Sequence, residues 1–471
     1  MTVIDASGSM SWPAYNLSST AVPVPVYRAT EEGYFRPDKN YRYNSAAGYW
    51  EETISASVAC PSNSHNPVSS SIYTGSCLNY HQMSRMDLVR WAMTGGTPNS
   101  CTGNNGTFNA NQCDPELWQQ PGNTGKVGSV CNNTIGGCIL LATNGTKVKV
   151  PWSRVWDGLA YQFTVMSPKP RMGALFYSDN GVRSDGQVYM GDFTAPNSTS
   201  DNFPYMNLIT AINSTDPNGG TPTGPAMWDT FNYFKQSDPQ YGGIPAQQGS
   251  GDRWKNPMYV CNGGGANCKV IPCAKNFVLL LSDGQWNTPS CSIDDGSSDP
   301  VKPAYQMHQT FTNAGTNMTT NVNATYTIGL FLGGTGEQSL KNVAMYGSFN
   351  KSGGWPDSLT GYPLGECNMD DCGDGKGSGC TALPPSTSDW DNDTIVGVPD
   401  TFHSAANATE IKDSIKNAIL DMLRRSSSGT AVSVLSSSEG SGANLMQALF
   451  YPLRSFSNNT EVSWTSDLMN Y

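Results

Sequence analysis

Charged residues, histidines and long apolar runs are all scarce in this 471-residue sequence. Only 14% of the residues are charged, the net charge is −11, and there are four histidines. Nucleic acid binds through clusters of lysine and arginine, which an acidic chain of this composition lacks. No apolar stretch is long enough to span a membrane. We therefore expect neither a nucleic-acid-binding protein nor a membrane-spanning one.

The recurrent catalytic motifs are also missing. The sequence contains neither a G-x-S-x-G nucleophile elbow nor an H-E-x-x-H metalloprotease motif. Two of the histidines, His81 and His308, fall at predicted helices, His81 near a helix start, where structural roles are more common than catalytic ones. A hydrolase is one hypothesis, but we expect that the protein is not an enzyme.

Cysteine, by contrast, is abundant, with 13 residues, yet no C-x-x-C pair occurs. Local clusters in Gly- and Asn-rich segments indicate disulfides formed in an oxidising compartment, and irregular spacing argues against the alternative, zinc. The odd number leaves one thiol free or paired outside the chain. No signal peptide opens the sequence, so we expect a mature fragment or the loss of an upstream export signal. The clusters are Cys60 and Cys77; Cys101, Cys113, Cys131 and Cys138; Cys261, Cys268, Cys273 and Cys291; and Cys367, Cys372 and Cys380.

The first segment with the chemistry of a binding site is D-x-S-x-S, formed by Asp5, Ser7 and Ser9 directly after an apolar pair. Side chains at alternate positions after a strand can point into one small volume. Carboxylate and hydroxyl oxygens are hard donors, which suit Mg²⁺, Ca²⁺ or Mn²⁺. An ordinary strand-to-loop turn has the same pattern, so the assignment depends on further donors elsewhere in the chain.

Two later segments supply such donors. Thr221 lies in a Gly-rich loop, Gly219–Pro225, ahead of a predicted helix, with Thr223 as the alternative donor. Asp283 follows an apolar run, Phe277–Leu281, typical of a central strand in a parallel sheet covered on both faces. Open α/β sheets place ligands at the carboxyl ends of their strands. The predicted metal ligands are therefore Asp5, Ser7, Ser9, Thr221 and Asp283.

These three segments together resemble the metal-ion-dependent adhesion site of von Willebrand factor A domains. The resemblance implies a divalent cation, Mg²⁺ or else Mn²⁺ or Ca²⁺, with one exchangeable position that accepts a carboxylate from a partner. Strands alternate with helices along the chain, so we expect a doubly wound, mostly parallel α/β sheet over residues 1–425. Long disulfide-rich insertions are expected at about 11–80, 97–165 and 334–400.

Four further segments resemble the PilY family, the tip-associated adhesins of type IV pili. The resemblance implies an extracellular position at the pilus tip or outer surface, reached by export through the periplasm. It also implies minor pilins or the tip complex as partners, together with a host or abiotic surface ligand. A structural or mechanosensing element of pilus assembly, with no ligand of its own, is the alternative. The segments are Leu78–Arg90, Lys275–Asn287, Met422–Ala431 and Trp464–Leu468.

The sequence departs from the PilY pattern in two respects. Residues 426–471 are expected to lead into a C-terminal β-propeller that is absent here, and pilus attachment is usually ascribed to that half. The insertions cannot be matched piece by piece.

A second candidate metal site lies in an acidic segment before the last predicted helix. Asp389, Asp391 and Asp393 occupy alternate positions, and Asp400 follows. Carboxylates spaced in this way can converge on Ca²⁺. The PilY family often carries D-x-D-x-D-G at this place, but here Thr394 replaces the glycine. A solvated acidic loop is the alternative interpretation.

Overall fold

The computed structural model describes most of two α/β units and several hairpins. The described residues are 1–15, 26–61, 66–98, 131–132, 137–151, 154, 157–164, 170–178, 188–190, 205–243, 246–247, 249–261, 268–272, 274–284, 286, 300–332, 335–350, 387–392, 396–426, 446–455 and 461–470.

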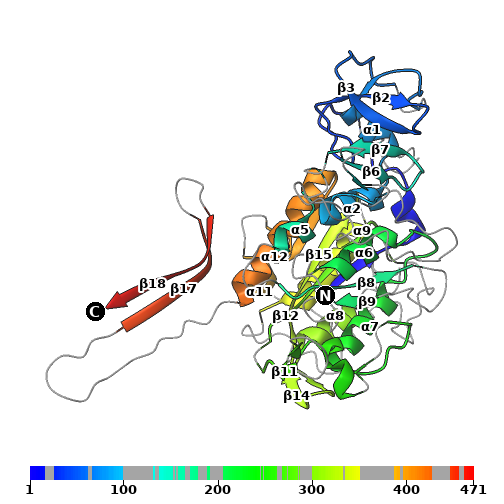
Figure 1. Ribbon diagram of the computed structural model, residues 1–471. Helices are drawn as coiled ribbons and strands as arrows, with labels where there is room; N and C mark the ends of the chain where they lie inside the picture. The colour runs from blue at the N-terminus through cyan, green and yellow to red at the C-terminus, as the bar shows by residue number, and fades with distance from the viewer. Residues whose placement is uncertain are drawn as a thin grey trace, which may run out of the picture.

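A six-stranded sheet forms the centre of the larger unit (Figure 1). Five neighbouring strands are parallel, and the sixth, at one edge, pairs antiparallel. This confirms the predicted doubly wound, mostly parallel α/β class. The strands in spatial order are β16 (Phe402–Ala405), β15 (Val322–Leu330), β12 (Asn276–Ser282), β1 (Thr2–Asp5), β8 (Gly173–Tyr177) and β9 (Val188–Met190).

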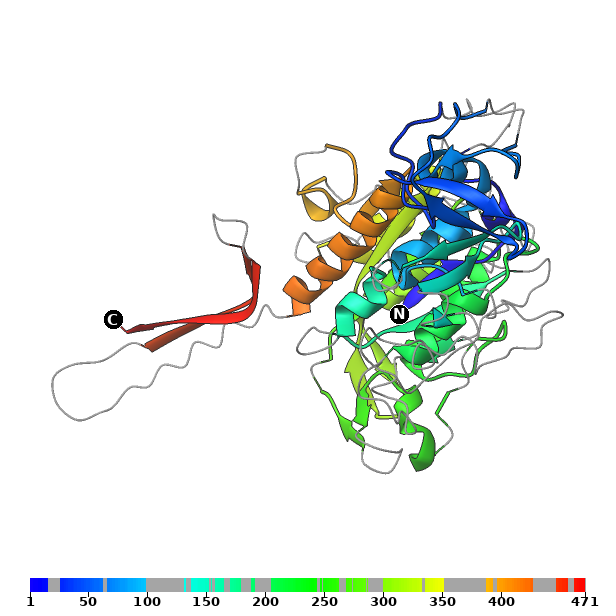
Figure 2. The same cartoon turned by 45° about the horizontal axis from the view of Figure 1, so that its top comes forward.

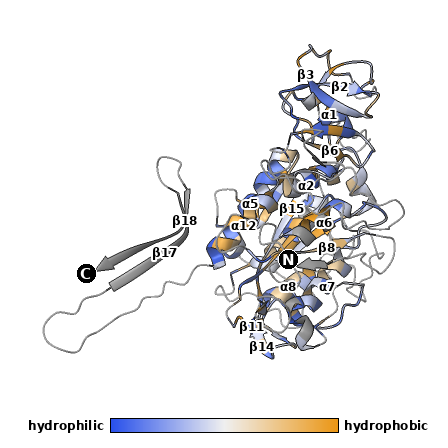
Figure 3. Ribbon diagram, viewed as in Figure 1, coloured by the Kyte–Doolittle hydropathy of each residue, from blue (hydrophilic) through white to orange (hydrophobic). Residues whose placement is uncertain are grey.

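The central strands are apolar on both faces because helices cover both faces. In β1, Val3 belongs to one hydrophobic cluster and Ile4 to the other, as expected when successive side chains point to opposite sides of a sheet. Hydrophobic residues accordingly concentrate in the strands and the inward faces of the helices (Figure 3). The helices of the Ile4 side are α2 (Arg85–Thr94), α6 (Met206–Ser214) and α12 (Ala408–Ser426); those of the Val3 side are α7 (Thr223–Lys235), α8 (Val301–His308) and α9 (Thr335–Ser348).

Helix α12 packs on the sheet through one apolar face. Ile411, Ile415 and Ile419 recur at helical spacing, and all three are buried in the Ile4-side cluster. At its start, the Asn407 side chain accepts a hydrogen bond from the backbone N–H of Glu410 at 3.0 Å. The helix predicted to follow the acidic segment is therefore confirmed, and it lies along the sheet in both views (Figures 1 and 2).

A second, smaller α/β unit lies at one end of the larger one (Figure 1). Its sheet combines strands from the first two predicted insertions, to which the sequence analysis assigned no common structure. β2 and β3 are paired antiparallel, and β3 joins β7 in parallel, which brings residues about 100 positions apart into one sheet. The strands in spatial order are β4 (Tyr73–Thr74), β2 (Asn40–Asn44), β3 (Tyr49–Thr53), β7 (Lys147–Val150), β6 (Gly137–Leu141) and β5 (Cys131–Asn132).

The segment Leu78–Arg90 spans the end of one helix and the start of another. Helix α1 (Gly75–Gln82) ends before Met83, and Ser84 then caps α2 through a capping box with Asp87. His81 accordingly lies in the last turn of α1, so its predicted place near a helix start is wrong. Gly95, in the left-handed region at φ 76°, ends α2.

The remaining described elements are short helices and hairpins. None of the helices within the described ranges has both the length and the apolar character needed to cross a lipid bilayer. The hairpin β17–β18 extends outward from the larger unit, which it approaches at α12 (Figures 1 and 2). The elements are η1 (Gly8–Ser11), α5 (Leu159–Thr164), η5 (Ser250–Lys255), β10 (Tyr259–Cys261), β11 (Cys268–Val270), β13 (Phe311–Asn313), β14 (Met318–Thr320), α11 (Thr387–Trp390), β17 (Met446–Ser455) and β18 (Glu461–Asn470).

One predicted disulfide pair is defined completely, between Cys60 and the buried Cys77 at the start of α1. Cys138 and Cys268 are also disulfide-bonded. Strand register places Cys138 opposite Cys131 and Cys268 opposite Cys261, partners within the predicted clusters. Seven of the cysteines lie outside the described residues: Cys101, Cys113, Cys273, Cys291, Cys367, Cys372 and Cys380. That most of the cysteines are paired, with about one free thiol, therefore stays a prediction.

Replacing both Cys60 and Cys77 by serine is expected to lower the free energy of unfolding by about 3 kcal/mol, the value for a loop of this length. The bridge spans 17 residues and ties an outer loop to the buried α1. Urea unfolding of the oxidised wild type and the double variant measures the difference. Equal stability would show that the bridge does not restrain the unfolded chain.

Candidate metal centre

The D-x-S-x-S segment leaves the carboxyl end of β1, at the centre of the large sheet. The Asp5 carboxylate is fully buried; its Oδ1 accepts a hydrogen bond from the backbone N–H of Ser7 at 2.8 Å. Its Oδ2 accepts one from the Ser282 hydroxyl at 2.7 Å. The Ser7 and Ser9 hydroxyls lie 3.0 Å apart. The alternation expected from the sequence thus places a carboxylate and two hydroxyls together.

The threonine loop is held against this segment by backbone hydrogen bonds. Gly8 N–H donates to the Gly219 carbonyl at 2.9 Å, and Asn218 N–H donates to the Ala6 carbonyl at 2.9 Å. A Cβ on Gly8 would lie only 3.2 Å from the Gly219 oxygen, so the two loops approach closely because Gly8 has no side chain. Thr221, in the same loop, is buried at this edge of the sheet.

Asp283 follows β12, the strand hydrogen-bonded to β1. Its Oδ1 accepts a hydrogen bond from the Ser9 hydroxyl at 2.7 Å. Its Oδ2 lies 2.7 Å from Nη1 of Arg85, the first residue of α2, in an ion pair with the carboxylate fully buried. The predicted residues are therefore gathered at one edge, and Arg85 is an addition that sequence reasoning missed. Arg85 belongs to the segment Leu78–Arg90, which resembles the PilY family, but this resemblance did not indicate that Arg85 lies in the site.

Two acidic groups in one buried place oppose each other's ionisation. Burial first, and then the negative charge of Asp283, raise the pKa of the Asp5 carboxyl from 3.8 to about 7, although its hydrogen bonds act the other way. Burial and the same charges raise the pKa of the nearby Tyr177 well above its usual value. Excess negative charge at the site is the electrostatic condition that a divalent cation relieves.

The donor set fits a hard divalent ion. Two carboxylates and three hydroxyls offer only oxygen, and in an octahedral site water completes the coordination. The Tyr177 hydroxyl, whose pKa burial and the charges of Asp5 and Asp283 raise, adds a further buried oxygen beside these donors. Bound to Asp5, Ser7, Ser9, Thr221 and Asp283, the ion would supply a Lewis-acidic position for a ligand oxygen.

Helix α2 connects the centre to the smaller unit. Arg90, almost fully buried, donates to the carbonyl of Thr215, which precedes the threonine loop. Asp87 accepts hydrogen bonds from the backbone N–H and the hydroxyl of Thr143, in the turn between β6 and β7. The same helix therefore contacts the metal centre at Arg85 and the smaller sheet at Asp87.

The predicted calcium segment is described only in part, because Asp393 lies outside the described residues. Asp391 Oδ2 accepts from the Gly397 N–H at 2.5 Å, and Asp400 Oδ1 accepts from the Asn392 N–H at 2.8 Å. Asp389 and Asp400 line a polar cavity of about 350 Å³, which Arg425 also lines. Among the described carboxylates these aspartates do not form a three-ligand cluster. Calcium binding here stays a prediction.

If the segment does bind Ca²⁺, the ion is expected to raise the melting temperature, because it relieves repulsion among carboxylates just before α12. Thermal unfolding of the wild type with Ca²⁺ and with EDTA measures the effect. The double variant Asp391→Asn and Asp393→Asn should lose the gain. An unmoved wild-type melting curve would identify a solvated acidic loop.

One three-residue group of potential metal ligands does occur in the described chain, formed by Cys60, Cys77 and His81. Both sulfurs are in the disulfide bond, so they offer no thiolate. Nε2 of His81 lies 3.2 Å from the Pro61 carbonyl, and burial lowers the pKa of its imidazole. In the oxidised protein this group is a packed disulfide rather than a metal centre.

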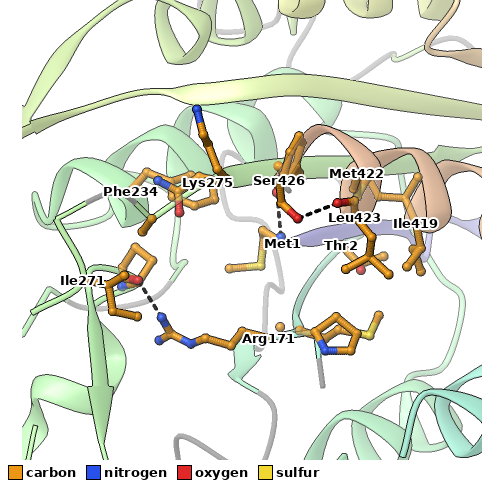
Figure 4. Close-up of a pocket in the computed structure, with 18 of the residues that line it drawn as sticks. Met1, Thr2, Arg171, Phe234, Ile271, Lys275, Ile419, Met422, Leu423 and Ser426 are labelled. Carbon is orange, nitrogen blue, oxygen red and sulfur yellow. Dashed lines mark hydrogen bonds between the residues drawn. The ribbon is translucent and has the colours of Figure 1, made fainter. Parts of the chain in front are cut away.

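A mainly apolar cavity of about 460 Å³ lies at the opposite end of the large sheet (Figure 4). Its lining includes Thr2 and Asn276, the first residues of β1 and β12, together with Leu423 of α12. In the same cavity Arg171 donates from Nη1 to the Pro257 carbonyl at 2.8 Å. Because the metal centre lies at the carboxyl ends of these strands, the two sites are separate.

Comparison with known proteins gives one match. Residues 28–117 match the family model described as "PilY1 homolog, small alpha/beta domain". The chain has a PilY1-like small α/β domain. The match begins in the smaller unit and includes α2, the helix that carries Arg85. No curated protein and no solved structure matches.

Proposed function

We propose that this chain is a pilus-associated adhesin that binds its ligand through a divalent cation. The observation that carries the proposal is a continuous series of hydrogen bonds that links Asp5 with the Ser7 backbone, the Ser7 hydroxyl with the Ser9 hydroxyl, and Ser9 with Asp283, 274 residues away. The PilY1-like domain supports a type IV pilus-associated role and a position outside the cell. Minor pilins or the tip complex would be its assembly partners.

The rim of the centre supports recognition of a ligand rather than turnover. Trp12, three residues after Ser9, is 50% exposed, and its ring lies 5.6 Å from the Arg85 guanidinium carbon. An aromatic surface beside a cation site offers both apolar contact and a polar edge. A carboxylate on a host or abiotic surface would take the exchangeable position on Mg²⁺, Mn²⁺ or Ca²⁺, and the rim would give selectivity.

The test is attachment of piliated cells that carry the full-length protein as wild type or as Asp5→Asn. Wild-type attachment to a surface should fall in EDTA and recover with Mg²⁺, while the variant should attach weakly under both conditions. Pilus number is counted in parallel. Equal attachment of the two strains, whatever the metal, would contradict the proposal.

One observation favours the alternative of a structural element in pilus assembly. The Arg85 guanidinium already balances the negative charge of Asp283, so a cation of the chain itself takes part of the role of a metal ion. In that case Asp5→Asn would leave both attachment and pilus number unchanged, whereas loss of the Arg85–Asp283 pair would lower pilus number. Counting pili therefore separates the two functions.

A further inference from the structure

The Arg85–Asp283 pair is buried at the centre of the candidate metal site. Arg85 Nη1 lies 2.7 Å from Asp283 Oδ2 and 3.4 Å from the Asp283 carbonyl oxygen. The carboxylate is fully buried and the arginine side chain is 9% exposed. With Ser9 on Oδ1, both carboxylate oxygens have a donor. Any cation that binds Asp283 must share it with Arg85 or displace it.

Arg85 is held in this position from several sides. Its backbone N–H donates to the Trp12 carbonyl at 3.1 Å, and Ala14 N–H donates to the Met83 carbonyl at 2.9 Å. The guanidinium carbon lies 5.6 Å from the Trp12 ring and 5.8 Å from the Phe331 ring. The two aromatic rings flank the guanidinium beside Asp283, and the backbone hydrogen bonds hold the start of α2 against the segment that carries Trp12.

The location is unfavourable for an arginine without such a partner. Arg85 is the first residue of α2, where the helix dipole favours a negative side chain. Burial adds a cost for a cation that has left water. Asp283 offsets both effects. In the metal-free protein the ion pair therefore stabilises the charged Arg85 side chain at this position.

We propose that Arg85 is a tethered counter-cation of the metal site, which competes with the divalent ion for Asp283 and so sets its affinity. The inference rests on the proposed function. In the metal-free protein the guanidinium balances Asp283. When a divalent ion binds, the guanidinium and the ion repel each other across one carboxylate, and part of the metal's binding free energy is lost. Arg85 is thus a positioning and affinity-determining residue, not a ligand.

The experiment uses Mn²⁺ alone as the probe, with the full chain as wild type, Arg85→Gln, Arg85→Lys and the control Arg154→Gln. Arg154 is a matched control because its Nη2 pairs with Glu32 Oε2 at 2.7 Å and its guanidinium lies over Trp91, away from the centre. Calorimetry gives the dissociation constant for Mn²⁺, and thermal unfolding in EDTA gives the stability of the metal-free protein.

Arg85→Gln is expected to bind Mn²⁺ about tenfold more tightly than the wild type, since one opposing charge is gone. It should also melt at a lower temperature in EDTA. Arg85→Lys keeps the charge and should bind Mn²⁺ with nearly the wild-type affinity. If Arg85→Gln does not fold, Arg85→Lys is the test variant. An affinity of Arg85→Lys tenfold above that of the wild type would then overturn the inference. Arg154→Gln should lower the melting temperature without changing the affinity.

The outcomes separate this inference from the proposed function. Equal or weaker Mn²⁺ binding by Arg85→Gln, with a binding wild type, overturns the counter-cation and leaves the adhesin proposal standing. Binding by Arg85→Gln alone supports the counter-cation and overturns metal-dependent adhesion by the wild type. Absence of binding in both proteins overturns both.

Discussion

Asparagine in place of Asp5 is expected to abolish Mg²⁺ and Mn²⁺ binding and, at the same time, to raise the melting temperature of the metal-free protein at pH 8. Asp5 is fully buried near Asp283, and burial together with that charge raises the pKa of its carboxyl to about 7. Above that pH the folded protein carries an ionised group in an unfavourable place. Asparagine keeps the shape, accepts from Ser7 and hydrogen-bonds with Ser282, but carries no charge.

The sign of the pH dependence follows from the same shift. The pKa of the Asp5 carboxyl is about 7 in the folded protein, compared with 3.8 in the unfolded chain. Between these values the unfolded state binds fewer protons, so the contribution of Asp5 to stability falls as pH rises. Metal-free wild type should therefore lose stability from pH 5 to pH 8 more steeply than Asp5→Asn. Metal affinity should rise over the same interval, because the ligand must be deprotonated.

Thermal unfolding in EDTA across this pH range, for wild type and Asp5→Asn, measures the effect. Asp229→Asn is a control, since burial also raises the pKa of Asp229. Its carboxylate accepts hydrogen bonds from the backbone N–H groups of Gln240 and Gly243 and is not part of the metal centre. The explanation would be wrong if Asp5→Asn were less stable than wild type at pH 8 in EDTA.

Alanine in place of Asp283 is also expected to abolish metal binding, but with the opposite effect on the metal-free protein. Removing one partner of a buried ion pair leaves Arg85 without its carboxylate, which costs about 3–5 kcal/mol. A carboxylate at the end of a strand with no partner could be removed with little effect on the fold. The buried ion pair predicts a loss of stability instead.

The double variant Arg85→Met with Asp283→Ala isolates the cause. Replacing both charges by apolar groups is often neutral or stabilising, so the double variant should recover most of the lost stability while still failing to bind metal. Urea unfolding in EDTA compares the wild type, the single and the double variants. A double variant no more stable than Asp283→Ala would show that the loss has another origin, such as the lost Ser9 contact.

The large sheet could be predicted from sequence because its signals are local. Apolar runs such as Phe277–Leu281 and the isoleucine stripe of α12 each identify an element without reference to the rest of the chain. The order of the polar segments Asp5–Ser9, Gly219–Pro225 and Asp283 then places them at one edge, since carboxyl ends of parallel strands meet there.

The smaller unit could not be predicted because its sheet depends on a single non-local pairing. Trp50 of β3 pairs with Val148 of β7, and most of the chain between them carries no strong periodicity. Arg85 escaped notice for a related reason. It stands 198 residues from Asp283, and nothing in the residues around it indicates which carboxylate a helix start will meet.

The most direct measurement is the anomalous scattering of Mn²⁺ in crystals of the wild-type chain. A divalent ion held as proposed gives one strong peak about 2.1 Å from oxygens of Asp5, Ser7 or Ser9. The same peak should vanish in crystals of Asp5→Asn grown in Mn²⁺. No peak at the carboxyl ends of β1 and β12 at saturating Mn²⁺, or a peak unaffected by Asp5→Asn, would contradict the central claim that this chain binds through a metal.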